Sequence, residues 1–133
     1  MPRYLLDTNI LSDLVRNPSG RIADRIAEIG DRQICTSVIV AAELRYGAAK
    51  KGSRQLTRQV AIVLGSLDIL GLEAPADVTY GELRARLEQA GNLIGPYDLL
   101  IAAHALSLGL TLVSDNEREF SRVHGLRVEN WLR

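Results

Sequence analysis

Short apolar runs alternate with longer amphipathic stretches along this 133-residue chain, and that alternation constrains its fold more than any other feature. The apolar runs predict buried strands at residues 4–6, 33–36, 68–70, 110–113 and 126–128. Elsewhere apolar residues recur every three or four positions, which predicts helices at 10–15, 22–29, 37–49, 53–64, 76–90 and 96–108 and a helical turn at 117–120. Strands joined through helices run parallel, so we expect an α/β fold with a mostly parallel sheet of about five strands flanked by helices.

The length of the chain and its short connections predict a single domain over residues 1–133. Cys35 is the one cysteine, so neither an intrachain disulfide nor a cysteine-based zinc site can form, which suits a reducing cytoplasm. We expect no signal peptide, because the acid Asp7 comes too early, and no membrane span, because no apolar run reaches the roughly 18 residues that a spanning helix needs. We therefore expect a cytoplasmic protein without a membrane contact.

Polar side chains stand close to the points where the expected strands end. Asp7 directly follows the first strand, and Asp115 and Asn116 follow the fourth. Glu43 lies about two turns into the helix after the second strand, and Asp98 lies in the first turn of the 96–108 helix. Parallel sheets of this kind bind ligands beyond the carboxyl ends of their strands, so these side chains could reach one common site.

Each acid by itself also has a purely structural explanation. An Asp after a strand often forms a turn or a cap, although here Thr8 or Asn9 is our expected cap of the first helix. Asp98 suits the positive end of a helix dipole. Glu43, however, stands among apolar residues, where a carboxylate is costly unless it is exposed or paired. Three such oxygen donors, with little histidine, favour Mg²⁺ or Mn²⁺.

Four sequence motifs carry a resemblance to a known family. They read LDTN at 6–9, AELRYG at 42–47, GPYDLLIAAHA at 95–105 and LVSDNEREF at 112–120. In this order and spacing they resemble the PIN-domain ribonucleases and, within them, the VapC toxins of bacterial toxin–antitoxin modules. The resemblance runs from Leu5 to Trp131, which is essentially the whole chain.

The resemblance implies a three-layer PIN-like fold and assigns metal binding to Asp7, Asp98 and Glu43. It gives Ser114 a role in orienting the acidic pocket. The family usually has a fourth acid two residues after this serine or threonine, and here that position is Asn116, with Asp115 beside it. Either Asp115 substitutes for the missing acid, or Asn116 acts through a water molecule.

The resemblance also implies an activity and its partners. The expected function is that of a Mg²⁺-dependent endoribonuclease, with Mn²⁺ as the other candidate ion, cleaving structured RNA such as tRNA by a metal-activated water. A VapC-type toxin would form a homodimer and bind a cognate VapB-like antitoxin in a heterotetramer or a larger assembly. The alternatives are a non-catalytic RNA-binding PIN-like module and a housekeeping RNA-processing nuclease.

A cationic segment follows Glu43 directly. No acid occurs between residues 44 and 67, whereas Arg45, Lys50, Lys51 and Arg54 are all cationic. The chain has 16 basic and 16 acidic side chains, so attraction of RNA must come from such a local patch rather than from net charge. We expect these four side chains to bind RNA phosphates, and the alternative is a solvated helix face or an antitoxin-facing surface.

Overall fold

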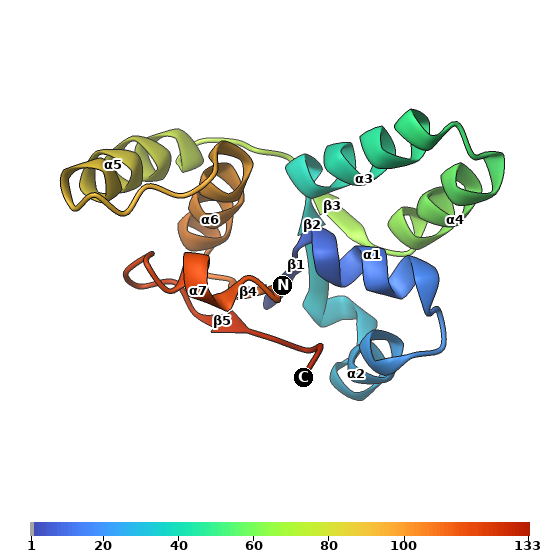
Figure 1. The fold of residues 1–133 in the computed structure, drawn as a ribbon. Coiled ribbons are helices and arrows are strands. Elements are labelled where there is room, and N and C mark those ends of the chain that lie inside the picture. Colours follow the sequence, from blue (N-terminus) through green and yellow to red (C-terminus); the bar gives the residue numbers. More distant parts are fainter. Residues whose placement is uncertain (1) are drawn as a thin grey trace.

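A five-stranded parallel sheet forms the centre of the protein, which we describe from a computed structural model for residues 2–133 (Figure 1). The strand order is β3-β2-β1-β4-β5, and every pair of neighbouring strands is parallel. The strands are β1 (Tyr4–Leu6), β2 (Ile34–Ser37), β3 (Asp68–Leu70), β4 (Thr111–Val113) and β5 (Val128–Glu129). The expected parallel sheet is thus confirmed.

Within residues 2–133, seven α-helices flank the sheet in a three-layer arrangement. They are α1 (Thr8–Arg16), α2 (Arg21–Ile29), α3 (Val38–Lys51), α4 (Arg54–Gly65), α5 (Ala76–Gln89), α6 (Pro96–Leu108) and α7 (Glu117–Phe120). In Figure 1, α1 to α4 group on one side of the molecule and α5 and α6 on the other. Within residues 2–133, no helix combines the length and the apolar character that crossing a membrane would require.

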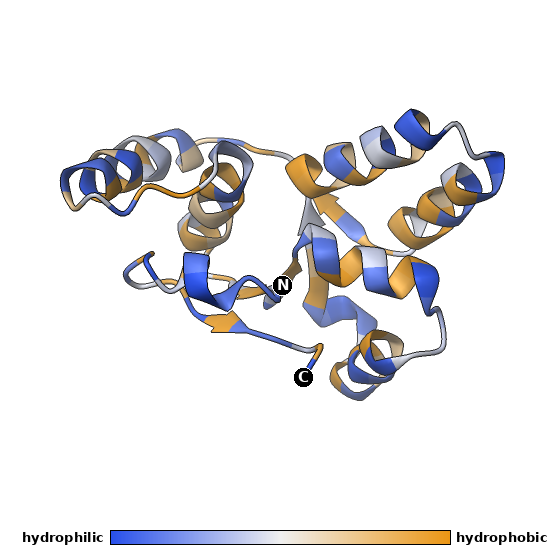
Figure 2. Ribbon diagram, viewed as in Figure 1, coloured by the Kyte–Doolittle hydropathy of each residue, from blue (hydrophilic) through white to orange (hydrophobic). Residues whose placement is uncertain are grey.

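One apolar core joins the sheet to both groups of helices. Leu5 and Leu112 on neighbouring central strands are fully buried, as are Ile10 on α1 and Ile101 on α6. Figure 2 shows this pattern as apolar residues on the strands and on the inner helix faces. Burying each such side chain contributes about 1.5–3 kcal/mol to folding, so these contacts hold the sheet edges in fixed positions.

Two local expectations were wrong. The cap of α1 is Asp7, whose carboxylate accepts a hydrogen bond from Thr8 N at 2.8 Å, and not Thr8 or Asn9. The last strand covers 128–129 instead of 126–128, because Leu126 N bonds to Val123 O in a turn that ends only there.

Candidate active site

The candidate site lies where the strand order reverses. The chain moves outward from β1 through β2 to β3 and then returns to place β4 on the other side of β1. Loops after β1 and β4 therefore diverge at one edge of the sheet, which is the usual ligand position in parallel sheets. Asp7 follows β1 at this edge, and Ser114, Asp115 and Asn116 follow β4.

Asp7 is almost completely buried, with 4% of its surface exposed. Its Oδ2 accepts a hydrogen bond from Ser114 Oγ at 2.7 Å, while its Oδ1 accepts the bond from Thr8 N. Burial raises the pKa of Asp7 above its ordinary value, and the two hydrogen bonds oppose that rise. Both oxygens are thereby held in one orientation at the end of β1.

Glu43 projects from the middle of α3 and is connected to Asp7 through one residue. Thr8 Oγ1 donates a hydrogen bond to Glu43 Oε1 at 3.2 Å, and the backbone nitrogen of the same threonine binds Asp7. The pKa of Glu43 is raised, mainly by burial and further by the charge of Asp7. Residues 35 positions apart in the sequence thus share one polar cluster.

Asp98 lies in the first turn of α6, which begins with Pro96. Burial, and then the negative charges of Asp7, Glu119 and Glu43, together raise its pKa to about 7. Hydrogen bonds through Thr8 link Asp7 to Glu43, Asn116 bonds to Asp98, and the charges of Asp7 and Glu43 act on Asp98. Among the ion pairs within residues 2–133, none involves any of these carboxylates.

The loop after β4 places its three polar residues differently. Ser114 is buried and accepts a hydrogen bond from Asn116 N at 3.0 Å. The Asn116 side chain donates from Nδ2 to Glu119 Oε2 at 2.6 Å and to Asp98 Oδ2 at 3.4 Å. Asp115 is exposed, and its Oδ1 accepts from Asn9 Nδ2 at 3.0 Å. Asn116 therefore faces the acids directly, whereas Asp115 is bonded to α1.

Glu119 belongs to the same cluster, although it was not among the site residues expected from the sequence. Its Oε1 accepts a hydrogen bond from Gly95 N at 2.8 Å, at the start of α6. That bond and the one from Asn116 lower the pKa of Glu119, so its carboxylate stays charged. The available signal was spacing: Glu119 follows Asn116 by three positions, which is one helical turn.

The cluster is an open arrangement rather than a closed ligand cage. Across residues 2–133, no three His, Cys, Asp or Glu side chains lie in a group that could already hold a metal ion. The chemistry of the donors nevertheless fits a hard divalent cation, because Asp7, Glu43 and Asp98 offer carboxylate oxygens that form no ion pair within residues 2–133. Asp7, Glu43 and Asp98 are the residues that could bind such an ion.

His104 connects the two helices that carry Glu43 and Asp98. It lies on α6 with 1% of its surface exposed, and its Nδ1 is 2.8 Å from Oγ of Ser37. Ser37 in turn caps α3 by accepting from Ile39 N at 3.1 Å. Burial lowers the pKa of His104, so the ring is neutral. It is buried and bonds to the cap of α3, and no hydrogen bond within residues 2–133 joins it to any of the acids.

The four predicted RNA-binding cations lie along α3 and at the start of α4. Arg45, Lys50, Lys51 and Arg54 are all exposed, and the ion pairs found in residues 2–133 include none of them. A groove of about 290 Å³ between α1, α3 and α4 begins beside Glu43, and Lys51 is part of its lining. The cations are therefore free to bind an external anion.

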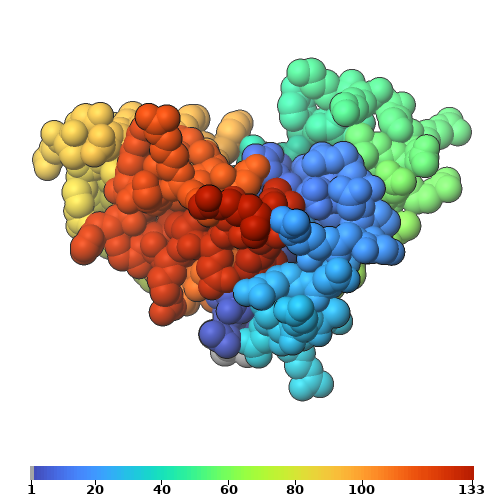
Figure 3. Space-filling view, turned by 60° about the horizontal axis from the view of Figure 1, so that its bottom comes forward, coloured from blue at the N-terminus to red at the C-terminus, as the bar shows by residue number. Residues whose placement is uncertain are grey.

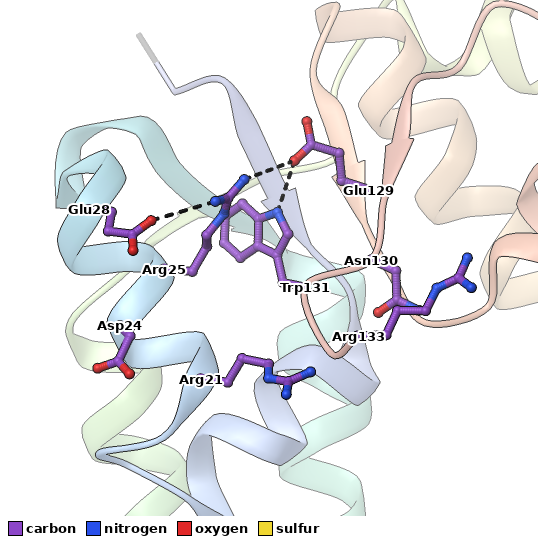
Figure 4. Close-up of a pocket in the computed structure, with 8 residues that line it drawn as sticks. All are labelled: Arg21, Asp24, Arg25, Glu28, Glu129, Asn130, Trp131 and Arg133. Atoms are coloured by element: carbon purple, nitrogen blue, oxygen red, sulfur yellow. Dashed lines mark hydrogen bonds and ion pairs between the residues drawn. The ribbon is translucent and has the colours of Figure 1, made fainter.

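A second hollow of about 610 Å³ lies between α2 and the C-terminal residues (Figure 4). None of the candidate site residues lines it. There Arg25 pairs with Glu28 at 3.5 Å and with Glu129 at 4.0 Å, and Trp131 Nε1 donates to Glu129 at 3.0 Å. Figure 3 shows the C-terminal segment lying against the α1–α2 region. These contacts attach the end of the chain to α2, and the buried Trp131 is a packing anchor.

Fold and site together define an α/β protein with a cluster of carboxylates at the edge of its parallel sheet. A family model described as PIN domain matches residues 4–126. The tRNA(fMet)-specific endonuclease VapC of Shigella flexneri is 38% identical over 134 residues, covering 98% of this chain and 99% of the relative. Ribonuclease VapC2 of Haemophilus influenzae is 42% identical over 135 residues, covering 99% and 100%.

A solved structure extends this likeness to the whole fold. VapBC2 from Rickettsia felis, crystallised with a DNA fragment from its promoter, contains a chain that is 40% identical and matches with a TM-score of 0.89. The match covers 96% of this chain and 98% of that one. The chain therefore belongs to the PIN-domain family, among its VapC ribonucleases.

Proposed function

We propose that this chain is the toxin of a VapBC-type toxin–antitoxin module and cleaves structured RNA, with tRNA as the first candidate, in a Mg²⁺-dependent reaction. The observation that carries the proposal is Asp98, whose carboxylate shares a partly buried site with Asp7, Glu43 and Glu119 and forms no ion pair within residues 2–133. Such a site favours a divalent cation. Under this proposal, residues 1–133 form one PIN domain, and the protein acts in the cytoplasm.

Each polar residue of the cluster has a distinct proposed task. Asp7, Asp98 and Glu43 are the metal ligands, and when bound, Mg²⁺ or Mn²⁺ would lower the pKa of a water molecule and neutralise charge on the phosphate. Ser114 fixes the orientation of Asp7 through its 2.7 Å hydrogen bond. Asn116 contacts Asp98 and Glu119, and this supports a role in holding the acids together.

Asp115 has a structural task in this proposal. Its hydrogen bond from Asn9 joins the loop after β4 to α1, and its exposed position sets it apart from the partly buried acids. Of the two alternatives for the missing fourth acid, this favours Asn116 acting through a water molecule. Glu119 is an additional charged group at the same place.

RNA would be bound by the cationic segment beside the acids. Arg45, Lys50, Lys51 and Arg54 have no ion-pair partner within residues 2–133, so they are free to bind phosphates. A tRNA substrate is supported by two relatives that are named tRNA(fMet)-specific endonucleases.

The proposed protein partners are a VapB-like antitoxin and a second copy of the chain. The solved VapBC complexes among the relatives support the antitoxin, and a heterotetramer or larger assembly of toxin homodimers with antitoxin is the expected form. Val15, Leu44, Leu56 and Val60 give the groove beside Glu43 an apolar lining. That groove is suited to an antitoxin segment that would block the site.

The test is RNA cleavage by the purified chain with Mg²⁺, with EDTA, and after the substitution Asp7→Asn. Asparagine also caps helices well, so α1 should survive in this variant. We expect cleavage of tRNA only with the metal, and a loss of at least about 100-fold in Asp7→Asn. Asp24→Asn, an exposed acid on α2, is the matched control and should keep full activity.

Two outcomes would contradict the proposal in different ways. Cleavage that persists in EDTA would exclude the metal-dependent reaction. Binding of RNA without cleavage at any metal concentration would instead favour a non-catalytic RNA-binding module. Growth arrest on expression, relieved by co-expression of an adjacent antitoxin frame, would separate a toxin from a housekeeping nuclease.

A further inference from the structure

Two exposed aromatic side chains stand next to acids of the candidate site. The chain has four tyrosines, one tryptophan and one phenylalanine. Tyr46 is 65% exposed and Tyr97 is 59% exposed, whereas the other four rings are buried or partly buried. Tyr97 directly precedes Asp98, and Tyr46 follows Glu43 by three positions. Within residues 2–133, neither ring belongs to the hydrophobic core.

Tyr46 shares one face of α3 with an acid and a cation. Residues three and four positions apart lie on the same side of a helix, so Glu43, Tyr46 and Lys50 follow one another along it at intervals of about one turn. The Lys50 ammonium lies over the Tyr46 ring, with Nζ 6.0 Å from the ring centroid. A carboxylate, an aromatic ring and an ammonium group thus form a row leading away from the acidic cluster.

This row matches the chemistry of a nucleotide next to a phosphate bound at the acids. An aromatic ring offers a stacking surface to any base, and a lysine offers a point charge to the adjoining phosphate. A base can stack on a protein ring only when it has left its own stack, as it does in single strands, loops and bulges. A helical RNA stem would not present such a base.

We propose that Tyr46 stacks on an unpaired nucleobase adjacent to the cleaved bond, with Lys50 bound to the neighbouring phosphate. This inference rests on the proposed ribonuclease function and specifies its substrate as an unpaired RNA segment, such as a hairpin loop. Charge favours RNA over a protein surface as the occupant. Residues 44–67 contain no acid, and the cations around the ring have no ion pairs within residues 2–133.

The first experiment compares cleavage of a hairpin RNA by Tyr46→Ala, Tyr46→Leu, Tyr46→Phe and Tyr46→Trp. Loss of one stacked base should raise KM by about 5- to 100-fold in the Ala and Leu variants and leave kcat nearly unchanged. The Phe and Trp variants should stay within about twofold of the parent, because they keep an aromatic face. Ile62→Ala removes another exposed apolar side chain, on α4, and should change neither parameter.

The second experiment measures stacking without cleavage. The hairpin carries the fluorescent base 2-aminopurine at an unpaired position beside the cut site and is mixed with the Asp7→Asn protein. Its fluorescence should be quenched on binding, and the quenching should vanish when Tyr46→Leu is added to Asp7→Asn. Lys50→Ala should lower the salt dependence of binding by about one counterion.

The outcomes separate this inference from the function on which it rests. If the parent protein cleaves no RNA, the proposed function fails. If the parent cleaves RNA, and the Tyr46→Ala and Tyr46→Leu variants have the same KM and the same quenching as the parent, only the stacking role fails. If Tyr46→Leu and Tyr46→Phe have the same KM, the contact needs only an apolar side chain and not an aromatic ring, which would overturn the inference. Loss of antitoxin binding with normal RNA kinetics would assign Tyr46 to a protein interface and also overturn it.

Discussion

Replacing Asp98 by Asn should stabilise the metal-free protein at about pH 8 and have much less effect at about pH 4.5. In the folded chain the pKa of Asp98 rises from 3.8 to about 7, first through burial and then through the charges of Asp7, Glu119 and Glu43. In the unfolded chain these causes are absent, and the side chain ionises near its ordinary value. Asparagine removes the charge and keeps an oxygen for the contact with Asn116.

The size of the effect follows from the proton that Asp98 retains on folding. Between about pH 4 and pH 7 the folded side chain keeps a proton that the unfolded one releases, so the free energy of unfolding falls as the pH rises, and the loss is complete above about pH 7. The two pKa values differ by about 3, which sets a ceiling of about 4 kcal/mol. Because Asp98 is partly exposed, solvent screening reduces the expected gain at pH 8 to about 1–2 kcal/mol.

The assay is urea unfolding in EDTA, followed by circular dichroism, for the parent and Asp98→Asn at both pH values. Comparing the two proteins at the same pH cancels the contribution of the buried, neutral His104. Asp24→Asn is the matched control on the exposed face of α2 and should show no gain. A variant less stable than the parent at pH 8, or equally stabilised at both pH values, would refute the account in which burial and repulsion raise the pKa of Asp98.

Further predictions address the metal, the orientation of Asp7 and the connection between helices. Mg²⁺ should raise the melting temperature of the parent more at about pH 8 than at about pH 5, because it binds the ionised acids, and equal shifts in calorimetry would count against the site. Ser114→Ala removes a hydrogen bond that lowers the pKa of Asp7, so the acidic limb of the pH profile of kcat/KM should move to higher pH; an unmoved limb would argue against this role. His104→Leu should cost about 1–3 kcal/mol in urea unfolding by removing the bond to Ser37, whereas His104→Asn, which can keep that bond, should cost less; equal losses would contradict it.

The strands, the helices and their order were predictable because their signals are local. Apolar runs and helical periodicity involve neighbours along the chain, and the structure confirms all five strands and all seven helices in sequence order. The errors were also local. A turn ends at Leu126, so the last strand begins two residues later than expected. The carboxylate of Asp7 caps α1, where Thr8 or Asn9 was the expected cap.

The acids Asp7, Glu43 and Asp98 could be selected from their motifs, but their shared environment could not be derived from them. Asp7 and Ser114 are 107 positions apart and meet only because β4 pairs with β1. Glu119 is held in the cluster by the backbone nitrogen of Gly95 at the start of α6, a contact that its spacing from Asn116 in the sequence did not predict.

The sequence alone determined which elements form and which residue types stand at their ends, because both depend on neighbouring side chains. The tertiary structure alone decided which carboxylates repel one another and which hydrogen bonds orient them. Burial and charge act through space, and the strand order that brings distant segments together is a property of the packed sheet.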